Sequence, residues 1–79
     1  MKVTVKYFAF FRERTGVSDE TFYIEKGKSI NDLLDIIIKK YNFNRGNEFV
    51  VSLNHEYIKS DVKLNEGDEV AIMMPSSGG

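Results

Sequence analysis

The side chains of this 79-residue chain offer little for covalent chemistry. There is no cysteine, so no side chain can supply a thiolate for nucleophilic catalysis, thioester formation or zinc binding. The single histidine, His55, stands between Asn54 and Glu56, and there is no second histidine to complete a metal site. We therefore expect His55 to be an exposed turn residue and expect no metal to be bound.

Sequence patterns for holding nucleotides, nucleic acid or membranes are missing too. The chain has neither a G-x-G-x-x-G motif nor a Walker loop, so we expect it to bind no cofactor itself. With 11 Lys and Arg against 12 Asp and Glu, there is no net basic field for nucleic acid. The apolar runs are far shorter than a membrane span, and because the alternation begins directly after Met1 we expect no signal peptide. A cytoplasmic location is the resulting expectation.

The remaining candidate for chemistry is the C-terminal run Pro75-Ser76-Ser77-Gly78-Gly79. Fully extended, these residues span about 17 Å, enough to carry a carboxylate deep into another protein. Glycine lacks Cβ, so a narrow channel can accept it. We predict that Pro75 directs the exit of the chain and that Ser76, Ser77 and Gly78 form the inserting thread. A frayed terminus is the alternative explanation.

The carboxylate of Gly79 is unhindered, so a partner that uses ATP could convert it to an acyl-adenylate. Such a mixed anhydride is an activated acyl group that a sulfur, thiol or amine nucleophile can attack. The reactive residue of the chain would then be Gly79, and the domain before it would be a carrier.

The elements that must position this tail begin with an alternating segment over residues 2–10, which predicts a strand with one buried face. The alternation breaks at Phe8 and Phe10, which fall on the side occupied earlier by Lys and Thr. Two explanations stay open: a loop covers these rings, or they form an exposed aromatic patch for a partner.

A helix is predicted from Ser29, a good N-cap with Asp32 three residues later. The apolar residues that follow recur at offsets 0, 3, 4, 7, 8 and 11, which indicates an amphipathic helix of about three turns. They are Ile30, Leu33, Leu34, Ile37, Ile38 and Tyr41. Further strands are predicted over 20–25, 49–54, 57–58 and 69–74, and a connector with at most one helical turn over 11–16.

This order of elements predicts an α+β fold with a mixed sheet of four to five strands and one main helix packed across it, as in a β-grasp. The first and last strands are expected to be parallel neighbours in the centre of the sheet. Residues 1–75 would form the domain and residues 76–79 a flexible C-terminal tail. The predicted core includes Val5, Tyr7, Leu34, Ile37, Leu53 and Val70.

Three segments of the sequence resemble the small subunit of molybdopterin synthase, a member of a ubiquitin-like family of sulfur-carrier proteins. They are Phe8-Ala9-Phe10-Phe11-Arg12-Glu13 with Gly16, then Ser52-Leu53-Asn54-His55-Glu56-Tyr57, and finally Leu64-x-x-Gly67-Asp68-Glu69-Val70-Ala71 with Pro75-x-x-Gly78-Gly79. The resemblance spans nearly the whole chain and is most specific in the last segment. It implies a ubiquitin-like β-grasp fold.

The resemblance also implies a function. A ubiquitin-activating-type enzyme would use ATP to adenylate Gly79, and sulfur transfer would convert it to a thiocarboxylate. The tail would then enter the large subunit of molybdopterin synthase, in a heterotetramer, and donate sulfur to precursor Z. The catalytic residues would belong to the large subunit. The residues expected at the interface with the partner are Phe8, Arg12, Met73 and Pro75.

One departure from the family is Met74-Pro75 in place of the usual Pro-Pro. Other functions are also compatible with the sequence. They are a thiamin-pathway sulfur carrier, a ubiquitin-like modifier whose terminal glycine is attached to substrate lysines, and an interaction module with a passive tail.

Overall fold

The computed structural model describes residues 1–43 and 49–75. Within them the chain forms five strands and two helices. In chain order these are β1 (Lys2–Tyr7), α1 (Phe10–Thr15), β2 (Asp19–Tyr23), α2 (Ile30–Tyr41), β3 (Val50–Leu53), β4 (Glu56–Ile58) and β5 (Glu69–Met73). Neither described helix is long and apolar enough to cross a lipid bilayer.

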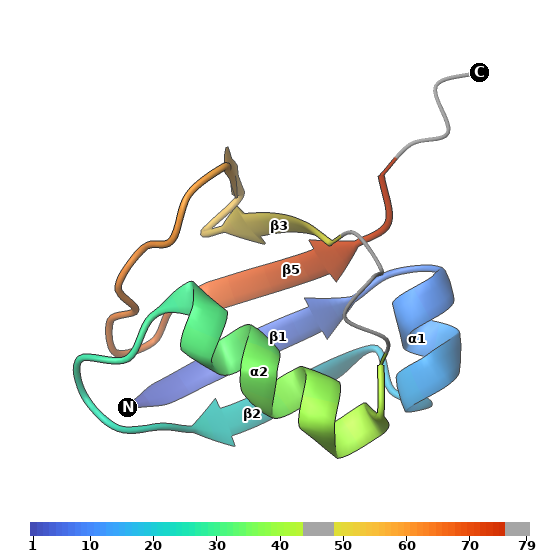
Figure 1. Ribbon diagram of the computed structural model, residues 1–79, viewed down its shortest axis with the longest axis horizontal. Coiled ribbons are helices and arrows are strands. Elements are labelled where there is room, and N and C mark those ends of the chain that lie inside the picture. Colours follow the sequence, from blue (N-terminus) through green and yellow to red (C-terminus); the bar gives the residue numbers. More distant parts are fainter. Residues whose placement is uncertain (44–48, 76–79) are drawn as a thin grey trace.

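The strands form one mixed sheet in the order β2-β1-β5-β3-β4, and α2 crosses one face of it (Figure 1). Strands β1 and β5 are parallel, and the other neighbouring pairs are antiparallel. The predicted α+β, ubiquitin-like β-grasp fold is therefore confirmed, including the central pairing of the first and last strands. Because that pairing is parallel, the C-terminal segment leaves the sheet at the end where β1 also finishes (Figure 1).

Helix α2 has the predicted bounds, and local hydrogen bonds explain both of its ends. The Ser29 backbone N–H donates to Asp32 Oδ2 at 2.9 Å, and the Asp32 N–H donates to Ser29 Oγ at 3.4 Å, which completes a capping box. The hydrogen bond from the Ser29 backbone holds the pKa of Asp32 below its usual range. Asn42 ends the helix in the left-handed conformation, with φ of 56°, and its N–H donates to the carbonyl of Ile38.

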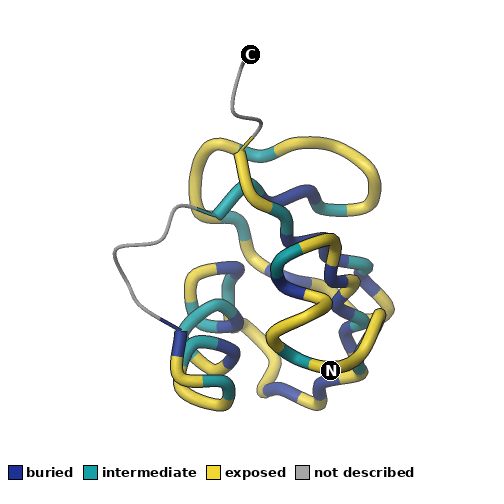
Figure 2. Tube along the Cα trace, turned by 90° about the vertical axis from the view of Figure 1, so that its right-hand side faces the viewer, coloured by how far each residue is buried: buried dark blue, intermediate teal, exposed yellow. Residues whose placement is uncertain are grey.

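The core lies between α2 and the sheet face that it covers. Buried positions alternate with more exposed ones along β1. Figure 2 shows buried and exposed stretches interspersed along the chain. Of the predicted core residues, Val5, Tyr7, Ile37 and Val70 are buried. The predictions for Leu34 and Leu53 are wrong in degree, because both are only half-buried and pack against the margin of the core.

The predicted end of the first strand, at residue 10, is wrong. Strand β1 stops at Tyr7, and Ala9 reverses the chain with φ of 46° and ψ of −114°, close to the first central residue of a type II′ turn. The Phe11 N–H donates to the carbonyl of Phe8 at 3.0 Å and closes this turn. Helix α1 then begins at Phe10, so Phe10 does not continue the strand alternation.

The side chains of α1 explain why the chain turns there. Phe11 is fully buried and contacts the rings of Phe43 and Phe49. Phe10 packs against Phe11, and the Arg14 guanidinium lies 5.5 Å from the centroid of the Phe10 ring. An aromatic cluster therefore closes the end of the core next to the C-terminal ends of β1 and β5.

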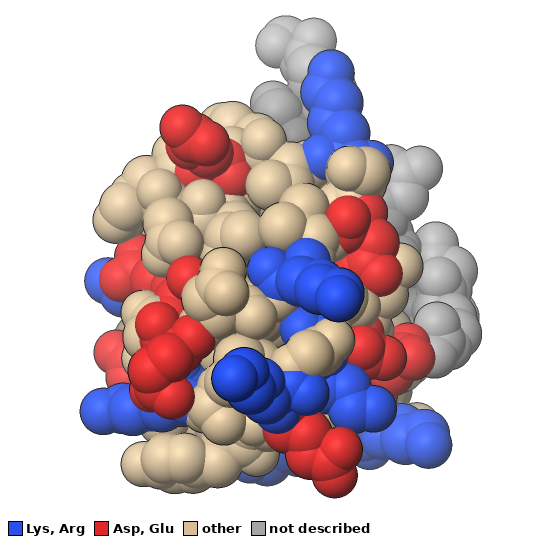
Figure 3. Space-filling model, turned by 90° about the vertical axis from the view of Figure 1, so that its left-hand side faces the viewer, with Lys and Arg blue, Asp and Glu red and all other residues tan. Residues whose placement is uncertain are grey.

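The charged side chains show no segregation by sign on the side of the molecule drawn in Figure 3. Lys and Arg side chains lie interspersed with Asp and Glu there. This pattern agrees with the formal net charge of −1 for the whole chain.

Candidate functional site: the open face of the sheet and the chain exit

The face of the sheet opposite α2 is open, and strand register decides which side chains share it. Residues Val3, Val5 and Tyr7 of β1 point toward the helix, so Lys2, Thr4 and Lys6 occupy the open face. The register then defines rows across the strands, of which the two nearest the chain exit matter here. The first row contains Asp19, Lys6, Ala71, Ser52 and Tyr57, and the second, nearer the chain exit, contains Met73 and Val50.

Phe8 continues this second row on the β1 side. Its N–H donates to the carbonyl of Ile72 at 3.3 Å, which places it beside Met73 in continuation of the parallel ladder. The Phe8 side chain is 44% exposed, so no loop of the described residues covers it. Of the two explanations for the break in alternation, exposure holds for Phe8, whereas Phe10 belongs to α1.

A shallow hollow of about 270 Å³ occupies this part of the open face, and we call it the open-face hollow. It is lined by Lys6, Phe8, Ser52, His55, Tyr57, Glu69, Ala71 and Met73. Ser52 and Ala71 are small and buried, and they form the floor between larger neighbours. Tyr57 is 71% exposed and lines the open-face hollow together with Phe8 and Met73, and an exposed apolar patch of this kind is typical of a partner-binding surface.

The polar side of the open-face hollow is organised around Glu69. The Lys6 ammonium lies 3.8 Å from one carboxylate oxygen of Glu69, and His55 Nε2 lies 3.4 Å from the other. His55 is an exposed turn residue, as predicted. It follows Asn54 in a β3–β4 hairpin whose two central residues both have positive φ, 50° and 73°, the pattern of a type I′ turn.

This hairpin is attached firmly to the start of β5. The Asn54 side-chain amide donates to Asp68 Oδ1 at 3.0 Å, and the Glu69 N–H donates to Asn54 Oδ1 at 2.9 Å. The buried Asp68 carboxylate also accepts a hydrogen bond from the Asn65 N–H at 2.7 Å. The strand that leads to the chain exit is therefore anchored at its beginning. This link could not be predicted from local patterns because it joins two turns that are separate in the sequence.

The chain exit follows β5 directly. Met74 is 42% exposed and Pro75 is also exposed. Proline has no N–H to donate, so Pro75 cannot extend the β5 ladder on that side. The predicted thread Ser76–Gly78 and the predicted reactive residue Gly79 lie outside the described residues, and their roles stay predictions.

Arg12 does not line the open-face hollow. It is an exposed residue of α1, the short helix that lies beside the C-terminal ends of β1 and β5 (Figure 1). The structure therefore brings Phe8 and Met73 together and puts Arg12 on a neighbouring element. Tyr57 was missed as a site residue, and its signal was its place between Glu56 and Ile58 in a short alternating segment.

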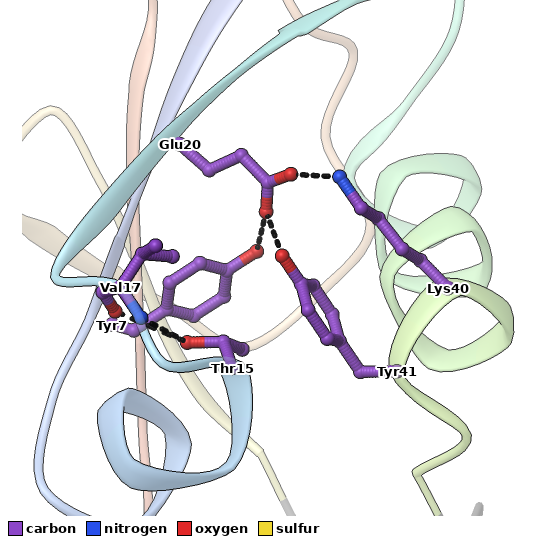
Figure 4. A network of polar contacts seen from close by, with 6 residues as sticks. All are labelled: Tyr7, Thr15, Val17, Glu20, Lys40 and Tyr41. Carbon is purple, nitrogen blue, oxygen red and sulfur yellow. Dashed lines mark hydrogen bonds and ion pairs between the residues drawn. The ribbon is translucent and has the colours of Figure 1, made fainter.

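A cluster of polar groups with shifted pKa values lies on the face of the sheet that α2 covers (Figure 4). Glu20 accepts hydrogen bonds from Tyr7 at 3.0 Å and from Tyr41 at 2.6 Å, and it forms an ion pair with Lys40. Partial burial acts to raise the pKa of Glu20, but the bonds from Lys40, Tyr41 and Tyr7 outweigh it, so this pKa lies below its ordinary value. Burial, followed by the bond to Glu20, raises the pKa of Tyr7.

This network joins β1, β2 and α2 on the covered face of the sheet, so its geometry gives it a structural role. Among residues 1–43 and 49–75, no group of three or more His, Asp and Glu side chains is placed to hold a metal ion. The open-face hollow and the chain exit are therefore the candidate functional site.

Comparison with known proteins shows which family the chain belongs to. A family model described as the ThiS family matches residues 5–79. The chain belongs to the ThiS family. It is 41% identical to a molybdopterin synthase sulfur carrier subunit from Chlamydomonas reinhardtii over the full length of both chains. The corresponding subunit from Arabidopsis thaliana is 35% identical, with all of this chain and 84% of that protein covered.

Solved structures of similar proteins have the same fold. A putative molybdopterin converting factor subunit 1 from Pyrococcus furiosus is 31% identical, with a TM-score of 0.83 over 96% of this chain and 99% of that one. The modifier protein SAMP1 from Haloferax volcanii, 24% identical, also has a TM-score of 0.83 over both full chains, and this likeness shows the fold alone. These comparisons confirm the resemblance to molybdopterin synthase small subunits that the sequence motifs indicated.

One similar structure contains a partner. It is a complex of subunits 1 and 2 of the molybdopterin-converting factor from Helicobacter pylori, 25% identical, with a TM-score of 0.63 over the full length of both chains.

Proposed function

We propose that this chain is the sulfur-carrier subunit of molybdopterin synthase and that Gly79 carries the sulfur as a thiocarboxylate. The observation that carries the proposal is the position of the chain exit, which follows β5 without a spacer and lies beside an exposed apolar surface. A partner that docks on the open face can therefore receive the tail in the same encounter. The curated relatives named as sulfur carrier subunits of molybdopterin synthase support the choice of pathway.

The chemistry begins at the carboxylate of Gly79. One carboxylate oxygen attacks the α-phosphorus of ATP on a ubiquitin-activating-type enzyme, and pyrophosphate leaves. A sulfur nucleophile then attacks the acyl carbon, and AMP leaves with the electron pair of the broken C–O bond. The chain supplies only the acyl group for these steps. Its own contribution is to present the terminus, so it acts as the sulfur-donor subunit and holds no cofactor.

In the second half of the cycle, the thiocarboxylate enters the large subunit and donates its sulfur to precursor Z. Water then releases the acyl group, which restores the Gly79 carboxylate, and a second round delivers the second sulfur. We propose the large subunit as the docking partner, within a heterotetramer, and the complex of subunits 1 and 2 from Helicobacter pylori supports this. Phe8, Met73 and Pro75 would contact it, with Arg12 at the margin.

Mass spectrometry of the intact protein, purified from its own cells, tests the carrier function. The expected species has one oxygen replaced by sulfur, located at the C-terminal residue. A variant that lacks Gly79 and a variant extended by one residue should both stay folded and lose sulfur transfer, because neither presents the reactive carboxylate at the correct reach. Molybdopterin formation by the shortened variant would contradict the proposal.

A ubiquitin-like modifier is the second candidate function. It is favoured by similarity to the small archaeal modifier protein 1 from Methanosarcina acetivorans, 26% identical, with a TM-score of 0.79 over 99% of this chain and 96% of that one. The same mass spectrometry separates the two functions, because a modifier gives isopeptide conjugates from Gly79 to lysines of other proteins. A thiamin-pathway carrier would instead bind a thiazole synthase, and binding to the two purified partners distinguishes that case.

A further inference from the structure

Two methionines are adjacent in the sequence where the open-face hollow meets the chain exit. The chain contains no cysteine and three methionines, and Met73 and Met74 are adjacent where β5 ends. Met74 is 42% exposed, and Met73 is half-buried and lines the open-face hollow. Small molecules that reach the open-face hollow therefore also reach a sulfur atom in the middle of the proposed docking surface.

A polar group lies next to the sulfur atom of Met73. The Tyr57 hydroxyl, from β4, donates a long hydrogen bond of 3.9 Å to Met73 Sδ. A thioether is a weak acceptor, whereas the oxygen of a sulfoxide is a strong one. The same hydroxyl could therefore satisfy a sulfoxide oxygen at Met73 while the open face stays in contact with water.

We propose that Met73 is a site of reversible oxidation by peroxides and that its sulfoxide blocks docking of the large subunit. This inference rests on the proposed function, because docking is the step that it regulates. In the oxidation, the sulfur lone pair attacks one oxygen of hydrogen peroxide to form the S–O bond, and the O–O bond breaks with its electron pair on the other oxygen. The resulting hydroxide takes the proton of the transferred OH group, which leaves the sulfoxide and one water. Sulfur loses two electrons and peroxide gains them. Methionine sulfoxide reductases, which use thiols as the reductant, reverse the step.

The fold tolerates this change because Met73 belongs to the open face. Its neighbour Ile72 points into the core and is fully buried, whereas Met73 is not part of the hydrophobic core formed by residues 1–43 and 49–75. Docking changes the situation, since an apolar partner surface removes water from the sulfoxide and from the Tyr57 hydroxyl. Burying such polar atoms without full hydrogen bonding weakens binding by about tenfold or more.

The experiment treats the purified full chain with hydrogen peroxide and measures three quantities: the oxidised residues by tandem mass spectrometry, the unfolding temperature, and the affinity for the large subunit of the same organism. We expect oxidation at Met73, an unchanged unfolding temperature, and an affinity at least tenfold lower that reductase treatment restores. Oxidised protein that binds within twofold of untreated protein would overturn the inference. So would a loss of affinity that accompanies unfolding.

Two variants assign the effect to one sulfur atom. Each is compared with its own untreated form, whatever its starting affinity. Peroxide should leave the affinity of Met73→Leu unchanged and should still lower that of Met74→Leu. The opposite pattern would overturn the assignment to Met73. Met1 serves as an internal reference for oxidation at the far end of β1.

A third variant tests the part played by Tyr57. In Tyr57→Phe the sulfoxide loses this donor but keeps its contact with water, so peroxide should leave the unfolding temperature of the variant unchanged, as in the wild type. A fall in the unfolding temperature of the oxidised variant alone would contradict the exposed position of the sulfoxide on the open face. Failure of the proposed function has a separate signature, because untreated wild-type protein would then not bind the large subunit at all.

Discussion

Alternate residues of the same strands form the two faces of the sheet, and the faces differ in what covers them. On the helix side, Val5, Val70 and Ile72 are completely buried under α2 and its neighbours. On the open side, Phe8 and Tyr57 keep 44% and 71% of their surface exposed. Because side chains alternate between the faces, neighbouring residues in one strand can have separate roles. Stability and partner binding should therefore be separable by single substitutions.

The largest expected effect comes from a pair of neighbours in β5. Ile72→Ala should lower the free energy of unfolding by about 2–5 kcal/mol, because it leaves a cavity under α2. Met73→Ala removes a side chain of similar size from the open face and should cost less than about 1 kcal/mol. Urea unfolding of both variants measures the difference. Equal losses would mean that the open face also belongs to the core.

The next effect is on binding. Phe8→Lys should weaken binding to the large subunit by about tenfold to a hundredfold, because a charged side chain replaces an apolar one at the centre of the docking surface. Its free energy of unfolding should change little. Tyr23→Lys is the matched control, because Tyr23 is 78% exposed on the edge strand β2. Surface plasmon resonance measures both, and a collapse of the fold in Phe8→Lys would place Phe8 in the core.

The Glu20 network should give the helix side a dependence on pH. The pKa of Glu20 is lowered in the folded chain, so its stabilisation is present above the unfolded value of about 4.3 and is lost as the pH falls through the folded value. At neutral pH, Glu20→Gln should cost about 1–2 kcal/mol because the ion pair with Lys40 is lost. Urea unfolding from pH 7 down to pH 3 should show the two proteins converging. A constant gap would contradict the assignment.

The smallest effect concerns the turn between the faces. Ala9 has a positive φ of 46° that an alanine adopts only with strain, and it is exposed, so its methyl group gains no burial. Ala9→Gly should therefore raise the free energy of unfolding by about 1 kcal/mol. The same substitution at Ala71, in the extended strand β5, should lower it by a similar amount. Chemical denaturation of the pair tests both signs, and a loss at position 9 would show that the turn is not strained.

Local patterns predicted most of the fold. The alternation of apolar and polar residues predicted β1 and β5. The Ser29 N-cap and the apolar repeat that follows it predicted α2 and its bounds. Helix α1 was predicted only as a connector with at most one helical turn over 11–16, because the predicted strand extended through Phe10. The chain reversal after β1 depends on the positive φ of Ala9, and an alanine does not predict a positive φ.

The candidate site was harder to predict because it depends on register. Phe8 and Met73 were each selected, but only the parallel pairing of β1 with β5 places them side by side. Tyr57 enters the open-face hollow through the pairing of Ser52 with Tyr57 across β3 and β4. The bonds of Glu20 reach residues 13 to 21 positions away, beyond the range of any local pattern.

The parallel pairing of β1 with β5 also has a mechanical consequence. A force that pulls on Pro75 while the other end of the chain is held at Lys2 acts along two adjacent strands in opposite directions. The hydrogen bonds between the strands are then loaded together in shear, whereas a hairpin pulled at its open end would lose them one after another. The domain should therefore resist mechanical unfolding when it is pulled by its C-terminal segment. An unfolding motor that binds this segment would pull the folded domain away from its surroundings before it unfolds the domain.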